Sequence, residues 1–267
     1  MEIAQAFFLG LVQGVTEVLP VSSSGHLILV PWFFNFTDPG LIFNVALHLG
    51  TLIAVIIFFR KDWVGIIANF FKVIKRRKFD SNKERLPFYI ILATVPGALG
   101  GYFLESRAEG IFRNPLLIAG TLFLFGVTLL LAEKTAKSKK EENKSWVTSL
   151  VIGAAQALAI IPGVSRSGIT ISVGMFQGFT REAAARFSFL ISVPIILGAV
   201  MFSVRKVDLL DLYSLVFWVG LISAVITSFL TIKFLMNFVR NHKLSIFAYY
   251  RFLLAFVIVI FYLLGER

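Results

Sequence analysis

The residues best suited to chemistry lie in two short polar motifs within an otherwise apolar chain. The first motif covers residues 13–26 and contains Glu17, three consecutive serines and a histidine. The second covers residues 162–168 and contains Arg166 between two serines. Carboxylate, hydroxyl, imidazole and guanidinium groups serve acid–base, nucleophilic and anion-binding chemistry. The two motifs are therefore the predicted functional site.

The two motifs resemble two copies of one pattern. A shift of 143 residues places Gly10, Gln13, Val21, Ser22, Ser24 and Gly25 on Gly153, Gln156, Val164, Ser165, Ser167 and Gly168. The copies differ in their charged groups, because Glu17 and His26 fall opposite isoleucines while Arg166 falls opposite Ser23. This division of the charges predicts one composite site formed by both halves of the chain.

The composition places this site inside a membrane. The chain has 267 residues, of which 57% are hydrophobic and 15% charged, and its mean hydropathy is +0.84. Six apolar stretches approach the ~20 residues that a helix needs to cross a bilayer. They are residues 42–59, 88–104, 115–132, 187–204, 214–235 and 249–264. Two further apolar regions, 3–37 and 146–178, hold the motifs near their middle. We expect an all-α polytopic integral membrane protein with about six full spans and two re-entrant helical hairpins.

Basic residues cluster in two connections between the predicted spans. Residues 60–86 contain nine Lys or Arg and residues 133–145 contain five, within a net charge of +11. The positive-inside rule places both connections in the cytoplasm. Residues 31–41, 105–114 and 205–213 then lie outside. Orientation and contact with anionic membrane lipids account for this charge. The basic runs lack interleaved aromatic platforms, so no nucleic-acid partner is expected.

The alternation of spans gives the two halves opposite orientations. Residues 1–132 enter and leave their motif region from outside, whereas residues 146–267 do so from inside, and the basic cytoplasmic loop 133–145 joins them. The sequence therefore predicts a single membrane domain, residues 1–267, built as an inverted repeat. Inverted repeats with broken helices place their sites near the middle of the bilayer.

Prolines break the helices of both motifs. Pro20 and the Pro162–Gly163 pair leave backbone N–H groups free, which at bilayer depth is tolerated where water or a ligand is present. The helix that begins after each break favours an anion at its N-terminus. Phosphate is the natural candidate, because Arg166 provides a planar fork that matches its oxygens. The groups expected to bind a phosphate or pyrophosphate belong to Ser22, Ser23, Ser24, Gly25, Ser165, Ser167, Gly168 and Thr170.

The titratable groups each have a second interpretation. A carboxyl deep in an apolar segment is costly and indicates function, but a purely structural ion pair of Glu17 with Arg166 is the alternative. His26 follows a turn and is predicted to be catalytic or ligand-binding. Each serine alone is equally well explained as a helix N-cap. We interpret His48 as a packing or hydrogen-bonding residue within a span and His242 as part of a charged loop.

The motifs resemble the signatures of the bacterial undecaprenyl-pyrophosphate phosphatase family, the bacitracin-resistance phosphatases. The first family signature, Glu/Gln-Gly-x-Thr-Glu-x-x-Pro-x-Ser-Ser-x-Gly-His, is met by Gln13, Gly14, Thr16, Glu17, Pro20, Ser22, Ser23, Gly25 and His26. The second, Pro-Gly-x-Ser-Arg-Ser-Gly-x-Thr, is met by Pro162, Gly163, Ser165, Arg166, Ser167, Gly168 and Thr170. Some members have a second glutamate where this chain has Gln13, so a mechanism with two carboxylates there is not expected. The resemblance covers essentially the whole chain.

This resemblance implies an enzyme of the bacterial plasma membrane. It would hydrolyse undecaprenyl pyrophosphate to undecaprenyl phosphate and inorganic phosphate, recycle the carrier lipid for peptidoglycan synthesis, and confer bacitracin resistance. The implied pyrophosphate site comprises Glu17, Ser22, Ser23, His26, Ser165, Arg166, Ser167 and Thr170. The resemblance also implies a divalent cation, Mg or Ca, and no organic cofactor. Glu17 is the only carboxylate of the two motif regions, so the ligands of such an ion are otherwise unknown.

The nucleophile is left open by the residues alone. Ser23 is favoured, with Glu17 or His26 as its base, while attack by His26 and direct attack by water are the alternatives. Arg166 and the two helix N-termini would stabilise the transferred phosphoryl group. The expected catalytic residues are therefore Glu17, Ser23, His26 and Arg166, with Gln13 in a secondary role.

Two other classes of membrane protein were compared with this prediction. A transporter or flippase for polyprenyl-phosphate lipids would use the same anion site within an inverted repeat, and it is the alternative function. Ser24-Gly25-His26 is similar to a signature of the phosphatidic-acid phosphatase superfamily. That superfamily needs a histidine shortly after its Ser-Arg pair, and none follows Arg166 before His242, so it is excluded.

Small residues at 97–101 predict close helix packing within or between protomers. The second case would produce a homo-oligomer.

Overall fold

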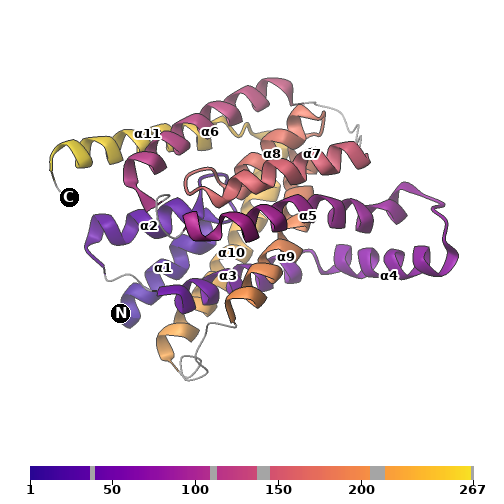
Figure 1. Ribbon diagram of the computed structural model, residues 1–267, viewed down its shortest axis with the longest axis horizontal. Helices are drawn as coiled ribbons and strands as arrows, with labels where there is room; N and C mark the ends of the chain where they lie inside the picture. Colours follow the sequence, from indigo (N-terminus) through magenta and orange to yellow (C-terminus); the bar gives the residue numbers. More distant parts are fainter. Residues whose placement is uncertain (37–39, 109–112, 137–144, 205–213, 266–267) are drawn as a thin grey trace.

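The described part of the chain is helical throughout. The computed structural model describes residues 1–36, 40–108, 113–136, 145–204 and 214–265, and no strand occurs within them (Figure 1). The helices are α1 (Ile3–Thr16), α2 (Ser23–Phe34), α3 (Gly40–Phe58), α4 (Arg60–Arg76), α5 (Asn82–Ala108), α6 (Pro115–Thr135), α7 (Trp146–Ala157), η2 (Leu158–Ile160), α8 (Arg166–Phe176), α9 (Arg181–Val204), α10 (Leu215–Asn241) and α11 (Ser245–Leu263).

The long helices confirm a multi-pass membrane protein. Within the described ranges, five helices are long and apolar enough to cross a bilayer, namely α5, α6, α9, α10 and α11. Helix α3 supplies a sixth span when it is counted together with α4, from which it is bent by 80°. All six predicted apolar stretches therefore lie on helices of the structure.

The helices that carry the motifs are too short to cross. Helices α1, α2, α7 and α8 contain 14, 12, 12 and 11 residues. At 1.5 Å per residue they extend roughly 16 to 21 Å, against a hydrocarbon core of about 30 Å. The α1–α2 and α7–α8 pairs are thus the two motif-bearing hairpins. Their polar turns lie where the sequence places the breaks.

The basic segment 60–86 contains a helix that the sequence analysis treated as a connection. Helix α4 occupies Arg60–Arg76, and together with the start of α5 it extends beyond the rest of the molecule (Figure 1). Ile66 and Val73 on one face of α4 are buried, which is the spacing of an amphipathic helix. The high charge of this segment hides that pattern in the sequence. The predicted loops 31–41, 105–114, 133–145 and 205–213 fall wholly or partly outside the described residues.

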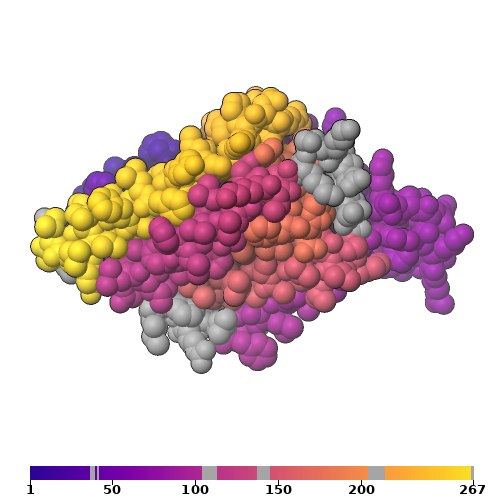
Figure 2. All heavy atoms as spheres, turned by 90° about the horizontal axis from the view of Figure 1, so that it is seen from above, coloured from indigo at the N-terminus to yellow at the C-terminus, as the bar shows by residue number. Residues whose placement is uncertain are grey.

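Close helix contacts hold the hairpins in the bundle. Helix α1 packs against α10 and α7 against α5, while α6 and α11 lie side by side (Figures 1 and 2). A Cβ on Gly153 would approach the Ala93 carbonyl oxygen to 2.5 Å, so this contact requires glycine. The inverted relation between residues 1–132 and 146–267 stays a prediction.

The small-residue face 97–101 packs within the chain. Gly97 lies against Gln156, and Gly100 lies against Ala157. These contacts account for the two glycines without a second protomer. The homo-oligomer stays a prediction.

Candidate active site

The two motif turns have the same local geometry. Ser22 caps α2 and Ser165 caps α8, with φ of 76° and 68°. Their side chains accept the N–H groups of Gly25 and Gly168 at 3.3 and 3.1 Å. Non-glycine residues rarely adopt positive φ, and such strain persists only where the surroundings enforce it. The pair of motifs found by the 143-residue shift is thus also a pair of matching turns.

Hydrogen bonds join the two turns to each other. Ser22 Oγ accepts the N–H of Gly163 at 3.0 Å, and Ser167 Oγ donates to the Leu19 carbonyl at 3.1 Å. Gly163 itself has φ of 92°, and a Cβ there would lie 2.8 Å from the Ile118 carbonyl oxygen. Glycine is therefore required at this break. The fold brings the two motifs into direct contact.

Arg251 of α11 connects the same two turns through their backbone carbonyl groups. Its side chain is fully buried, and its Nε donates to the Pro20 carbonyl at 2.6 Å while its Nη2 donates to the Val164 carbonyl at 3.2 Å. The sequence analysis did not select Arg251. An arginine within a predicted span was the available signal, since such a charge is costly in a membrane.

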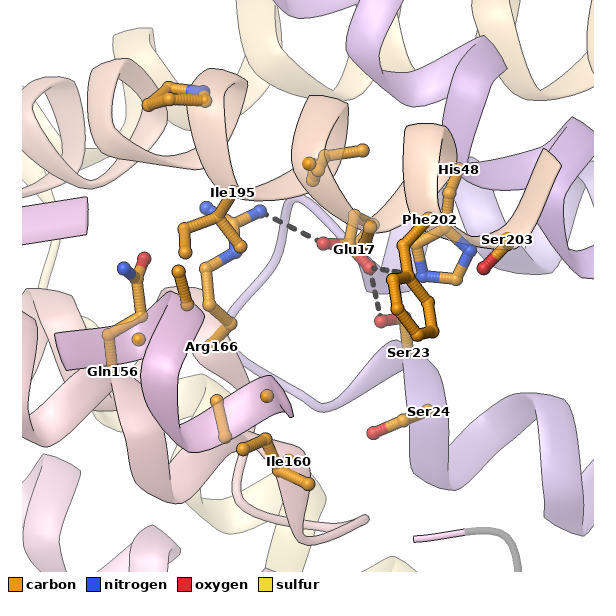
Figure 3. A pocket seen from close by; sticks show the side chains of 18 of the residues that line it. Glu17, Ser23, Ser24, His48, Gln156, Ile160, Arg166, Ile195, Phe202 and Ser203 are labelled. Atoms are coloured by element: carbon orange, nitrogen blue, oxygen red, sulfur yellow. Dashed lines mark hydrogen bonds and ion pairs between the residues drawn. The ribbon is translucent and has the colours of Figure 1, made fainter. Parts of the chain in front are cut away.

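A cavity of about 600 Å³ opens beside these turns. Its polar end is lined by Glu17, Ser23, Ser24, His48, Ser165 and Arg166. The rest of the lining is mainly apolar and comes from α5, α9 and the α7–η2 segment, among them Ala98, Gly101, Ile160, Ile195, Gly198 and Phe202, with Gln156 as a polar member. Figure 3 shows Glu17 between Arg166 and Ser23, facing this space. The cavity therefore joins a charged end to an apolar end.

Glu17 is the centre of the polar end. Its Oε1 accepts a hydrogen bond from Arg166 Nη2 at 2.9 Å, and its Oε2 accepts one from the Ser23 hydroxyl and one from Gln13 Nε2 at 3.4 Å. Arg166 Nη1 donates to the Ser188 carbonyl at 3.2 Å. The carboxylate of the first motif and the guanidinium of the second are thus in contact. The ion pair that the sequence analysis gave as an alternative exists, and it forms part of the cavity wall.

Five residues predicted to bind pyrophosphate lie outside the cavity lining. They are Ser22, Gly25, Ser167, Gly168 and Thr170. Thr170 Oγ1 donates to the Arg166 carbonyl at 2.7 Å and pairs with Ser188 Oγ at 2.7 Å. Ser22 and Ser167 make the contacts between turns described above. In the structure these residues hold the turns, and their contact with a ligand stays a prediction.

His26 is not among the described residues that line the cavity. Its Nδ1 donates to the Ser22 carbonyl at 2.7 Å, and its Nε2 accepts from the Tyr250 hydroxyl at 2.7 Å. Both ring nitrogens are occupied by these bonds. The predicted catalytic role of His26 stays a prediction, and this geometry favours a role in fixing the first turn.

His48 is a cavity residue that the sequence analysis interpreted otherwise. Its Nδ1 donates to the Asn44 carbonyl at 2.8 Å, and its Nε2 lies 3.9 Å from Glu17 Oε2 (Figure 3). The expected hydrogen bond is confirmed, but the ring also faces the polar end of the cavity. Whether the His48 ring faces the cavity depends on how α3 is rotated about its axis in the bundle. The sequence alone does not give this rotation.

Among the described residues that line the cavity, Glu17 is the one carboxylate that could face a cation. In the described ranges no group of three or more His, Cys, Asp or Glu residues could hold an ion. Both oxygens of Glu17 already accept hydrogen bonds from protein groups. Hard cations such as Mg²⁺ and Ca²⁺ prefer several oxygen ligands, and Glu17 as one of these ligands stays a prediction.

The fold and the site define a class of protein, a polytopic membrane protein whose cavity joins a charged site to an apolar space. A family model described as bacitracin resistance protein BacA matches residues 6–257, and the chain belongs to this family.

The curated relatives extend over nearly the whole chain. The undecaprenyl-diphosphatase of Moorella thermoacetica is 47% identical over 260 residues, which is 97% of each chain. That of Caldicellulosiruptor bescii is 47% identical over 263 residues, again 97% of each chain. That of Gemmatimonas aurantiaca is 41% identical over 268 residues and all of each chain. The suspected family resemblance is thereby confirmed.

Proposed function

We propose that the protein is an undecaprenyl-diphosphatase, which hydrolyses undecaprenyl pyrophosphate to undecaprenyl phosphate and inorganic phosphate. The observation that carries this proposal is the position of Ser23, whose hydroxyl donates to Glu17 while Arg166 holds the other carboxylate oxygen at the end of a cavity. Relatives at 41–47% identity over nearly the full length bear the same enzyme name. Bacitracin resistance and a role in cell-wall synthesis follow from this activity.

The cavity suits a substrate with a charged head and an apolar tail. Arg166 provides donors for pyrophosphate oxygens, and Ser24 and Ser165 line the same end. The small and apolar faces of α5 and α9 would contact the first prenyl units. A cavity of about 600 Å³ lies in the range that holds a drug-sized ligand, so most of a long prenyl chain would remain in the bilayer.

In the mechanism that fits this arrangement, Ser23 is the nucleophile. Glu17 takes the hydroxyl proton as the Ser23 oxygen forms a bond to the terminal phosphorus. The bond from that phosphorus to the bridging oxygen breaks, and undecaprenyl phosphate leaves with the electron pair. Water then hydrolyses the phosphoserine and releases inorganic phosphate. Arg166 stabilises the charge of the transferred group.

Direct attack by water at phosphorus is the competing mechanism. It would use Glu17 as base and leave Ser23 as a positioning group. A Ser23 variant separates the two mechanisms, as described in the Discussion.

The divalent cation stays a prediction. An Mg or Ca ion would neutralise charge on the pyrophosphate when bound. Glu17, the carboxylate at the polar end of the cavity, would be its protein ligand.

The cellular setting follows from the proposed substrate. The protein would lie in the bacterial plasma membrane, with its basic segments on anionic lipids of the cytoplasmic leaflet. The net charge of +11 supports this contact with lipids. No nucleic-acid partner is proposed.

Release of inorganic phosphate tests the proposed function. Purified protein would be given undecaprenyl pyrophosphate in detergent and in proteoliposomes, with and without a chelator. We expect phosphate release in both preparations, with loss of activity in the chelator if the cation is required. Binding or movement of the lipid across the bilayer without phosphate release would instead support the transporter.

A further inference from the structure

The titratable groups around Glu17 include one from outside the motifs. Glu17 Oε2 lies 3.4 Å from Gln13 Nε2 and 3.9 Å from His48 Nε2. The amide of Gln13 cannot accept and release a proton under ordinary conditions, whereas an imidazole can do both. This chain has Gln13 where the family signature also allows glutamate. Besides Ser23, the source of the proton, His48 is therefore the group beside this oxygen that can exchange a proton with Glu17.

The hydrogen bond to Asn44 fixes which ring nitrogen can do so. A backbone carbonyl only accepts, so His48 Nδ1 carries the proton that it donates to Asn44 O at 2.8 Å. The tautomer of a histidine is set by the bond that its other nitrogen makes. His48 Nε2 then presents its lone pair to the cavity. His26 differs in this respect, because Tyr250 already occupies its Nε2.

We infer that His48 is the proton relay of the proposed phosphatase, receiving from Glu17 the proton that Ser23 gives up. The inference rests on the proposed function. The 3.9 Å separation between His48 Nε2 and Glu17 Oε2 exceeds a direct hydrogen bond, so one water in the cavity carries the proton between them.

With the relay, Glu17 acts as a base twice in one catalytic cycle. When Ser23 attacks, the Oγ–P bond forms, the bond to the bridging oxygen breaks with its electrons on undecaprenyl phosphate, and the serine proton passes through Glu17 to His48. Glu17 is a carboxylate again when water attacks the phosphoserine. It takes a proton from that water and returns it to Ser23 Oγ, which leaves phosphorus with the electron pair. His48 finally releases its proton to water in the cavity.

The charged groups around His48 are few. Within the described lining of the cavity, the charged or titratable side chains are Glu17, His48, Arg166 and Tyr102. Helices α9 and α10 also pack against α3. Their described charged residues lie at 181–186 and at 233–240, toward the C-terminal end of α3. There Arg186 contacts Asp62, and Lys233 lines a second cavity together with Phe58. Glu2 lies at the far end of α1.

The first test compares His48→Gln with His242→Gln in phosphate release. General acid–base groups contribute about a hundredfold or more to rate, so we expect His48→Gln to lower kcat by about a hundredfold with KM little changed. The pH profile of kcat should differ between wild type and His48→Gln, because the variant lacks a proton-exchanging group beside Glu17. His242 stacks on Phe238, is absent from the cavity lining, and should be silent.

The second test replaces His48 as the proton-exchanging group by a carboxylate at residue 13. In Gln13→Glu/His48→Gln a carboxylate replaces the amide beside Glu17, and we expect kcat to recover by about tenfold. The matched control is Gln156→Glu/His48→Gln. Gln156 lines the cavity but donates to the Ala93 carbonyl at 3.3 Å, so this change should not restore activity. A histidine with a purely structural role would not be replaced by a carboxylate at residue 13.

The outcomes separate the relay from the proposed function. Phosphate release by wild type together with an unchanged rate and pH profile in His48→Gln overturns the relay and leaves the phosphatase standing. No release by wild type overturns the phosphatase. If His48→Gln does not fold, His48→Asn takes its place, and an unchanged kcat and pH profile in that variant contradicts the relay.

Discussion

The carboxylate of Glu17 accepts a hydrogen bond from Arg166 Nη2 at 2.9 Å, although the two residues are 149 positions apart in the chain. Each residue belongs to one of the two polar motifs, and neither motif contains the other charge. Their contact forms at the polar end of a cavity whose other lining residues are mainly apolar. The pair therefore makes one site from the two similar motifs.

Removing one member of this pair should cost stability as well as activity. Glu17 and Arg166 have side chains only 8% and 11% exposed. Breaking a buried ion pair from one side leaves an unpaired charge and costs about 3 to 5 kcal/mol. We expect Glu17→Gln and Arg166→Gln each to lower the melting temperature in detergent. Glu182→Gln, which breaks the exposed pair with Arg240, is the control and should change it little.

The double variant Glu17→Gln/Arg166→Gln distinguishes an ion pair from two independent effects. The fall in melting temperature of the double variant should be smaller than the sum of the falls in the two single variants, because no unpaired charge remains. Additive losses would contradict the pairing.

Neighbouring serines should differ sharply in activity. Ser23 donates to Glu17, whereas Ser24 lines the cavity and lies 3.4 Å from Ser22 Oγ. If Ser23 is the nucleophile, Ser23→Ala should lower kcat by about a thousandfold or more, while Ser24→Ala should lower it by about tenfold or less. Phosphate release and trapping of a phosphoserine would be measured. Equal effects of both changes would favour attack by water.

Ser22 should act through the fold of the turns. Its side chain accepts N–H groups from Gly25 and Gly163, and Ser22→Ala would leave these buried donors without an acceptor. Each unsatisfied buried group costs about 1 to 3 kcal/mol. We expect a lower melting temperature together with reduced activity. The exposed Ser214, which caps α10 without a side-chain hydrogen bond, provides the matched control as Ser214→Ala. Unchanged stability of Ser22→Ala would contradict the bridging role.

The apolar end of the cavity should control use of the prenyl chain. A Cβ on Gly198 of α9 would meet no atom within 4 Å, and Gly198 lines the cavity. Gly198→Leu should therefore fold and obstruct this space. We expect a higher KM for undecaprenyl pyrophosphate, by about tenfold, with a smaller change for inorganic pyrophosphate. Gly120→Leu on α6 also has open space and lies outside the cavity lining, so it should leave both constants unchanged. Equal effects of the two variants would exclude a tail site between α5 and α9.

Much of this architecture follows from the sequence because it depends on local properties. The spans follow from apolar length, and the breaks follow from Pro20 and Pro162–Gly163, whose rings and flexibility end helices. The division of Glu17 and Arg166 between similar motifs predicted their meeting. These features need no knowledge of how a helix is rotated about its axis.

The remaining features depend on side-chain direction. Ser22 and Ser165 adopt positive φ, which turns Ser22 toward the second motif rather than toward the cavity. His48 and Arg251 lie on spans in which any face could point inward, so their contacts emerge only from packing. His26 was predicted to be catalytic from its position in the first motif, yet the Tyr250 hydroxyl of α11 occupies its Nε2. Partners far apart in sequence decide each of these cases.

The most direct test of the composite site is phosphate release from undecaprenyl pyrophosphate by wild type, Glu17→Ala, Arg166→Ala and the control Glu182→Ala, each shown to be folded by size-exclusion chromatography. The account predicts release by wild type and the control, and a loss of about a thousandfold or more in both site variants. Activity that survives in either Glu17→Ala or Arg166→Ala would contradict a phosphatase site shared by the two motifs.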